Sequence, residues 1–290
     1  MLPAEVARQI RLLEIRTAHL VEEITGGVYR SVFKGHGIEF DEVRQYTTDD
    51  DVRSIDWNVS ARMGTAYVKK FVEERELVVM LLVDLSASGE YGAALKNKRQ
   101  TAAELAALLA FSAGQNGDKV GLLLFTDQVE LYLPPRSGRR HALRMIRELL
   151  AFKPAGRGTD IDGALKETAR LMKKRGIVFL LSDLIEPEKF ARSLQLLSSR
   201  QDVIALELLD PVEKSFPLDV PVTVEDAETG EIVEFSGNRK QLDLALAQEE
   251  TAKAEVCRRA KTDLIPVLCT GDVLKPLIGF FAERKRRMRR

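Results

Sequence analysis

An uninterrupted apolar segment that ends in three oxygen-bearing side chains constrains the fold of this chain more than any other feature. Every residue from Leu77 to Val83 is apolar, and Asp84, Ser86 and Ser88 follow at alternate positions. A strand this continuously apolar is typical of a parallel sheet that is buried on both faces. Open sheets of this kind bind ligands at the carboxyl ends of their strands, so we expect the three side chains to converge there. Oxygen ligands that are mostly neutral suit a hard cation such as Mg²⁺.

A simpler interpretation is that Asp84 or Ser86 caps the helix that follows, because both residue types are favoured at helix N-termini. Two later segments favour the cation site. Thr159 lies in the stretch Gly-Arg-Gly-Thr-Asp before a predicted helix, and Asp183 ends a second apolar strand. Thr159 could also form a capping box with Asp162. A residue at a helix start lies at the mouth of the crevice, so both interpretations of Thr159 can hold.

The order Asp-x-Ser-x-Ser, then Thr, then Asp resembles the metal-ion-dependent adhesion site (MIDAS) of von Willebrand factor A (vWA) domains. The resemblance implies a bound divalent cation, Mg²⁺ with Mn²⁺ as a possible substitute, and a partner protein that offers an acidic side chain to it. Many vWA domains have a glycine after the last aspartate, where this chain has Leu184; this departure affects the turn more than the ligand set. The implied metal ligands are Asp84, Ser86, Ser88, Thr159 and Asp183.

The charge balance gives no reason to expect nucleic acid or an anionic membrane as a partner, since 44 basic and 44 acidic side chains cancel. Cys257 and Cys269 are too few for a disulfide framework and lack metal-ligand spacing, which indicates a reducing compartment. No apolar run approaches the ~20 residues of a membrane span, and the first residues lack the features of a signal peptide. We therefore expect a cytoplasmic protein with no membrane span.

From about residue 76 onward, buried strands alternate with amphipathic helices. This pattern predicts a doubly wound, mostly parallel α/β sheet of the vWA (Rossmann-like) class, in a domain that covers 76–290. The predicted strands cover 77–84, 119–125, 128–133, 177–182, 203–209 and 264–269. The predicted helices lie near 97–114, 139–151, 160–174, 238–261 and 272–287, and another begins near Pro187. Pro134 and Pro135 are expected to end the short edge strand at 128–133. Two alternating segments around a turn predict a β-hairpin insertion at about 219–235.

Residues 1–75 differ in character and form a predicted N-terminal α/β segment, with a helix at about 3–23. Three stretches stand out in it: 26–44, 49–62 with the element Asp-Asp-Val-Arg, and 67–76. They closely resemble the block that characterises the DUF58 family, whose members carry a vWA domain directly behind it. Relatives usually have a glycine before the paired aspartates, where this chain has Thr47, Thr48 and Asp49. The two resemblances together span most of the chain.

The N-terminal segment is dense in charges of alternating sign, which leaves two interpretations. In one, a cluster of acids holds two metal ions for phosphoester hydrolysis; these acids are Asp41, Asp49, Asp50, Asp51 and Asp56. In the other, the interleaved arginines fork onto the carboxylates in a partly buried ion-pair network. The arginines favour the network, because they would compete with a catalytic metal ion. Trp57 is expected to pack in the core beside this network.

We expect a binding protein and not an enzyme. The chain has no nucleotide-binding P-loop, no GxGxxG after a strand, and no GxSxG or Cys–His nucleophile arrangement. The DUF58 resemblance implies a MoxR-type AAA+ ATPase as the partner and an adaptor role in protein remodelling or complex maturation. Binding without metal, through the hairpin or the basic tail at 283–290, is a third possibility. The sequence leaves open the client protein, the oligomeric state and whether the metal site is occupied in the cell.

Overall fold

The chain divides into two compact units, residues 33–76 and residues 77–290, the latter grouped with 1–32. The computed structural model describes residues 8, 10–13, 37–48, 50–74, 77–90, 96–214, 222–235 and 239–287. Within the predicted first helix, residues 8 and 10–13 are helical, and the remainder lies outside the described residues. The assignment of residues 1–75 to one N-terminal domain stays a prediction.

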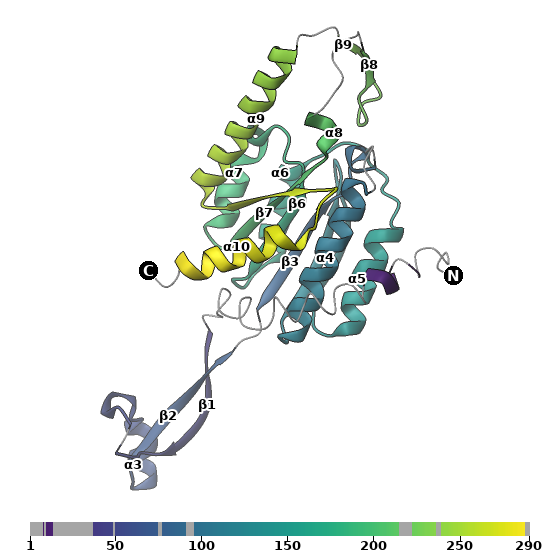
Figure 1. Cartoon of the computed structure of the whole chain (residues 1–290). Coiled ribbons are helices and arrows are strands. Elements are labelled where there is room, and N and C mark those ends of the chain that lie inside the picture. The colour runs from purple at the N-terminus through teal and green to yellow at the C-terminus, as the bar shows by residue number, and fades with distance from the viewer. Residues whose placement is uncertain are drawn as a thin grey trace. The chain divides into compact units, whose positions relative to one another are not determined.

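The larger unit is built on a six-stranded sheet (Figure 1). Its strands are β3 (Val78–Asp84), β4 (Lys119–Phe125), β5 (Val129–Arg136), β6 (Ile177–Ser182), β7 (Asp202–Leu209) and β10 (Asp263–Leu268). The strand order is β10-β7-β6-β3-β4-β5, and all neighbours are parallel except β5, which runs antiparallel to β4. Counted from β3 as the first strand, this is the order 3-2-1-4-5-6 of a doubly wound α/β fold. The predicted vWA-like fold class is confirmed.

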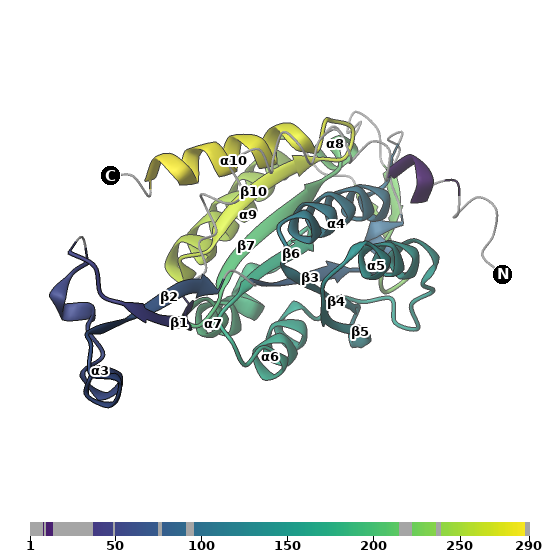
Figure 2. The ribbon, with the colours of Figure 1, turned by 90° about the horizontal axis from the view of Figure 1, so that it is seen from below.

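Helices cover both faces of this sheet (Figure 2). On one face lie α4, α5 and α10; on the other lie α6, α7 and α9. Their bounds are α4 (Lys98–Gln115), α5 (Arg139–Ala151), α6 (Ile161–Leu171), α7 (Pro187–Ser198), α9 (Arg239–Ala260) and α10 (Leu274–Arg287). Two short elements complete the unit, the 3-10 turn η2 (Ala87–Gly89) and the helix α8 (Pro211–Lys214).

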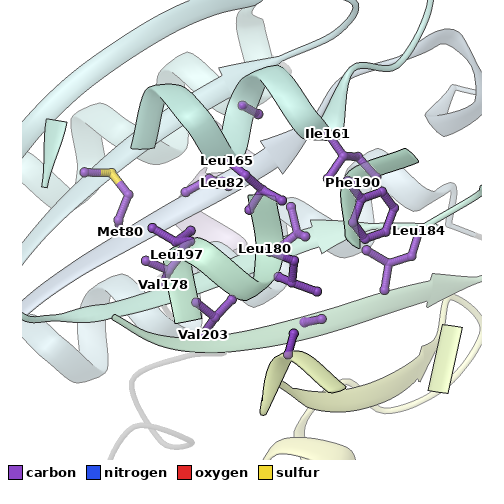
Figure 3. Packing of buried hydrophobic residues seen from close by; sticks show 14 of the residues in the cluster. Met80, Leu82, Ile161, Leu165, Val178, Leu180, Leu184, Phe190, Leu197 and Val203 are labelled. Atoms are coloured by element: carbon purple, nitrogen blue, oxygen red, sulfur yellow. The ribbon is translucent and has the colours of Figure 1, made fainter. Parts of the chain in front are cut away.

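The hydrophobic core has two layers because successive strand residues point to opposite faces of the sheet. Met80, Leu82, Val178 and Leu180 pack beneath α6, α7 and α9, where Leu165 meets them (Figure 3). The residues between them along the strands, Leu81 and Phe179 for example, are just as buried. Full burial of one such side chain stabilises the fold by about 1.5–3 kcal/mol. Burial on both faces explains why the strand sequences are apolar without alternation.

The edge strand β5 continues through Pro134 and Pro135, so the prediction that these prolines end it is wrong. Proline cannot donate to the strand ladder, but an edge strand tolerates it, and β5 pairs with β4 alone. The pairing is irregular there, with a register shift between Val120 and Leu122. At Gly121, between those two residues, an added Cβ would lie 3.0 Å from the side chain of Pro135. Glycine on β4 therefore makes room for the proline.

The predicted hairpin insertion is present as two antiparallel strands, β8 (Val222–Glu225) and β9 (Ile232–Phe235). The predicted start of the insertion, at 219–221, lies outside the described residues. Among the described helices, none combines the length and the apolar character that a bilayer crossing requires.

The smaller unit is an antiparallel pair, β1 (Gly37–Gln45) and β2 (Tyr67–Glu74), with the 3-10 turn η1 (Val52–Ser54) and the helix α3 (Trp57–Met63) between them. Trp57 is 69% exposed, so the prediction that it packs in a core is wrong. It lies in the first turn of a seven-residue helix in which Ser60 is the buried residue. A helix this short presents little surface to its own unit, and its large aromatic residue lies outside that contact.

Candidate functional site

The site lies where the chain reverses its direction of winding. The first strand β3 and the fourth strand β6 are neighbours in the sheet. From β3 the chain leads to α4 on one face, and from β6 it leads to α7 on the other (Figure 2). The two connections diverge, so a crevice opens at the carboxyl ends of these strands. Asp84 is the last residue of β3, and Asp183 directly follows β6.

The turn after β3 brings the predicted aspartate and serines together. The backbone N–H of Ser86 donates to Oδ1 of Asp84 at 2.8 Å. The hydroxyls of Ser86 and Ser88 lie 3.1 Å apart, and the Ser88 hydroxyl donates to Oδ2 of Asp183 at 3.2 Å. The side chain of Ser86 caps no helix, and α4 is capped by Asn97. Four of the five predicted ligands thus form one hydrogen-bonded group.

Ser182 contacts both carboxylates and was not predicted. Its hydroxyl donates to Oδ2 of Asp84 at 2.8 Å and accepts the backbone N–H of Leu184 at 3.2 Å. Leu184 has a φ of 57°, in the left-handed region that glycine favours. Leucine therefore adopts, with strain, a conformation that glycine would adopt freely. Its side chain is buried in the core (Figure 3). The signal for Ser182 was its place next to Asp183 at a strand end.

Two buried lysines contact Asp183, and neither was predicted. Nζ of Lys98, on the first turn of α4, lies 3.0 Å from Oδ2 of Asp183 and 2.5 Å from Oε1 of Glu213. Nζ of Lys253 donates to the backbone carbonyl of Asp183 at 2.8 Å and pairs with Glu207 at 3.1 Å. Burial alone would lower the pKa of Lys98, but the charges of Asp183 and Glu213 raise it above its usual value. No sequence motif marked these lysines, since only the folded sheet brings them to Asp183.

The electrostatics of the crevice favour a cation. Burial, together with the nearby charge of Asp183, raises the pKa of Asp84 to about 6. Two carboxylates this close repel each other, and a positive charge between them would relieve the repulsion. Lys98 neutralises only the Asp183 side of the pair. Carboxylate and hydroxyl oxygens are also the donors that a hard cation prefers. The residues present therefore fit Mg²⁺.

Thr159 reaches the same crevice through a tethered loop. The backbone N–H of Ala87 donates to the carbonyl of Arg157 at 2.9 Å, and that of Asp160 donates to the carbonyl of Thr126 at 2.8 Å. Asp160, and not Thr159, caps α6, so the capping-box interpretation of Thr159 is wrong. Its hydroxyl donates instead to Oε1 of Glu228, in the turn of the hairpin, at 2.6 Å.

A cavity of about 380 Å³ opens beside these residues. Ser88, Thr159 and Asp183 line one part of it, and the hairpin turn lines another. Ile185 and Phe190 add apolar surface. Three of the five predicted ligands therefore face a space that can admit another side chain.

The acids of the smaller unit that the structure describes do not gather around a common point. Arg44 forks onto Asp50 with contacts of 2.5 and 2.8 Å, and this pairing lowers the pKa of Asp50 below its usual range. Asp51 caps η1 and Asp56 caps α3. Asp49 and the side chain of Asp41 lie outside what the structure describes. Within the described part of the chain, no three His, Cys, Asp or Glu residues are placed to hold a metal ion.

The family model described as "Protein of unknown function DUF58" matches residues 42–256. Uncharacterised proteins of Mycobacterium tuberculosis and Mycobacterium bovis are each 31% identical over 287 residues, which is 97% of this chain and 90% of theirs. Among solved structures, the conserved hypothetical protein BatB from Bacteroides thetaiotaomicron is 18% identical, with a TM-score of 0.49 over 73% of this chain and 99% of its own. The SpRpn10 VWA domain is 10% identical, with a TM-score of 0.41 over 71% of this chain and 95% of its own.

Proposed function

The chain belongs to the DUF58 family, and from the geometry of its crevice we propose that it is a Mg²⁺-dependent protein-interaction module that captures an acidic side chain of a partner. The observation that carries the proposal is the convergence of two buried carboxylates and two serine hydroxyls at the switch point of the sheet. Such a position is where doubly wound sheets bind their ligands. Asp84, Ser86, Ser88, Thr159 and Asp183 would hold the ion, with Mn²⁺ as a possible substitute.

The charges in the crevice explain why an acidic partner would be selected. Asp84 and Asp183 supply two negative charges, and Lys98 already offsets one of them. A bound divalent ion would carry positive charge that the carboxylates of the crevice do not fully neutralise. A carboxylate from a partner restores the balance, and the adjoining cavity leaves room for it. Metal and partner would therefore strengthen each other's binding by the same factor.

The partner that family resemblance supports is a MoxR-type AAA+ ATPase, with the chain acting as its adaptor in remodelling or maturing other proteins. The role requires no catalysis by the chain itself, and it is compatible with the expected cytoplasmic location. Binding through the hairpin or the tail without metal is the competing mode. In the described part of the tail, Arg284 and Arg287 pair with Asp263, which gives these arginines a role in holding α10 to the sheet.

The test is capture of a purified MoxR-type ATPase by the tagged chain, with Mg²⁺ and with EDTA. Ser86→Ala should abolish the Mg²⁺-dependent capture, because it removes one hydroxyl of the site. Ser112→Ala is the matched control: Ser112 is equally buried, and its hydroxyl has no hydrogen-bond partner among the described residues. In EDTA both variants should remain folded and unfold cooperatively. Undiminished capture by folded Ser86→Ala would exclude the metal-bridged mechanism.

A further inference from the structure

The turn of the inserted hairpin has a conformation that is fixed by its own side chains. Oδ1 of Asp226 accepts the backbone N–H groups of Glu228 and Thr229 at 2.8 and 2.9 Å. The N–H of Gly230 donates to the carbonyl of Asp226 at 2.8 Å, and Gly230 has a φ of 72°. Glycine meets this φ without strain. The turn therefore presents the Glu228 side chain from a defined backbone.

This turn contacts the threonine loop of the site at two points. The Thr159 hydroxyl donates to Oε1 of Glu228 at 2.6 Å, and the Arg157 guanidinium donates to the carbonyl of Ala227 at 3.3 Å. Oε2 of Glu228 lies 3.7 Å from where a Cβ would stand on Gly158, so the glycine leaves space for the carboxylate. Asp226, Ala227 and Glu228 line the same cavity as Ser88 and Asp183.

Glu228 is a partly buried carboxylate that shares its cavity with other acids. Asp183 and Asp226 line the same cavity, so a cation there would face several carboxylates. Glu228 reaches the predicted ligand Thr159 directly. A divalent ion in the crevice would compensate this carboxylate together with those of Asp84 and Asp183.

We propose that Glu228 is an internal ligand of the site, which occupies the position of the partner's acidic side chain until the partner displaces it. The inference rests on the proposed function and adds two points to it. The site is self-occupied, so a partner binds in competition with the hairpin. The partner presents a glutamate at the tip of a turn, with a backbone carbonyl beside it that Arg157 can bind. The binding turn of the partner should therefore resemble the chain's own segment Asp-Ala-Glu-Thr-Gly.

Two variants of the full chain separate this role from a general effect of charge. Glu228→Gln keeps the shape of the side chain and removes its charge. Glu225→Gln, an exposed glutamate of the same hairpin, is the matched control. Mn²⁺ alone is the first probe, titrated by calorimetry or by its electron paramagnetic resonance signal. We expect Glu228→Gln to bind Mn²⁺ about tenfold more weakly than wild type and Glu225→Gln to bind it unchanged. Equal affinities in all three proteins would overturn the proposal.

The second probe is a cyclised peptide with the sequence of residues 224–233. In the presence of Mn²⁺ it should bind Glu228→Gln about tenfold more tightly than wild type, because the variant no longer occupies its own site. Peptide binding that is equal in the two proteins, or absent from both, would overturn the proposal and leave the metal site standing. A chain that binds no Mn²⁺ in any form would instead overturn the proposed function, and the internal ligand with it.

Discussion

Nζ of Lys98 lies 3.0 Å from Oδ2 of Asp183, so a buried ammonium already neutralises one carboxylate of the candidate site. The lysine side chain is 4% exposed and the aspartate 8%. Lys98 also contacts Glu213, which gives it a second carboxylate to pair with. This arrangement makes the crevice tolerable without a cation and lowers its attraction for one.

Replacing Lys98 by methionine should therefore separate stability from metal affinity. In EDTA, Lys98→Met should lower the free energy of unfolding by about 3 kcal/mol, because Asp183 loses its buried counter-ion. The stabilisation gained on adding Mg²⁺ should be larger than in wild type, since the ion no longer competes with an ammonium. Thermal unfolding with EDTA and with Mg²⁺ measures both effects. Lys96→Met, at a more exposed lysine of the same helix start, should show neither. A Mg²⁺ response below that of wild type would contradict the competition.

Asp84 should make the metal-free chain more stable in mild acid than at neutral pH. Its folded-state pKa of about 6 lies above the usual value of 3.8, so the folded chain binds the proton more tightly than the unfolded chain. The loss of folding stability that the ionised carboxylate causes is complete above about pH 6 and absent below about pH 4. In EDTA at pH 7.5, Asp84→Asn should be up to about 3 kcal/mol more stable than wild type. Urea unfolding at pH 7.5 and 4.5 tests this. A difference that does not shrink toward pH 4.5 would contradict it.

Leu184 should respond unusually to truncation, because its backbone is in the left-handed region. Leu184→Ala should destabilise the fold by about 3 kcal/mol through lost burial. Leu184→Gly should destabilise it by about 1 kcal/mol less than alanine does, since glycine has no steric penalty at positive φ. The control is Leu180, equally buried on the straight strand β6, where glycine should be worse than alanine. Chemical denaturation gives the four values. The same order at both positions would show that strain at Leu184 is negligible.

Asp56 tests the hydrolase interpretation of the smaller unit. As the N-cap of α3 it accepts two backbone N–H groups, from Asn58 and Val59. Asp56→Ala should destabilise this unit by about 1 kcal/mol, whereas Asp56→Asn should be nearly neutral, because asparagine caps helices as well as aspartate. Hydrogen exchange of the backbone amides of α3 follows the opening of this unit. Metal-dependent phosphoester hydrolysis that is lost in Asp56→Asn would favour the enzyme instead.

The strands and helices of the larger unit were predictable because their hydrophobic patterns are strong and local. The predicted strands 119–125 and 177–182 and the helix 139–151 coincide with β4, β6 and α5, and most of the other bounds shift by a few residues. Two wrong predictions, one in each unit, have tertiary causes. Pro134 and Pro135 stay in β5 because the strand is at an edge and Gly121 makes room. Trp57 is exposed because α3 is too short to bury it, which its local sequence does not reveal.

The candidate site likewise combines residues that were predictable from the sequence with residues that were not. Asp84, Ser86, Ser88 and Asp183 were predictable because strand ends in a parallel sheet meet at one edge, and a local pattern marks each strand end. Ser182, Lys98, Lys253 and Glu228 were not predictable by such a rule. Lys98 and Asp183 are 85 residues apart, and Thr159 and Glu228 are 69 apart. No periodicity connects positions that distant along the chain.

The α/β class and the alternation of elements follow from hydrophobic patterns between near neighbours, and the order of the oxygen-bearing residues is read directly along the chain. The electrostatic state of the crevice exists only in the folded protein. Burial beside Asp183 raises the pKa of Asp84, and Lys98 from α4 offsets the charge of Asp183. The inserted hairpin brings a third carboxylate, that of Glu228. These effects depend on the distance and burial of charges, which are fixed only when the sheet, its helices and the insertion have packed together.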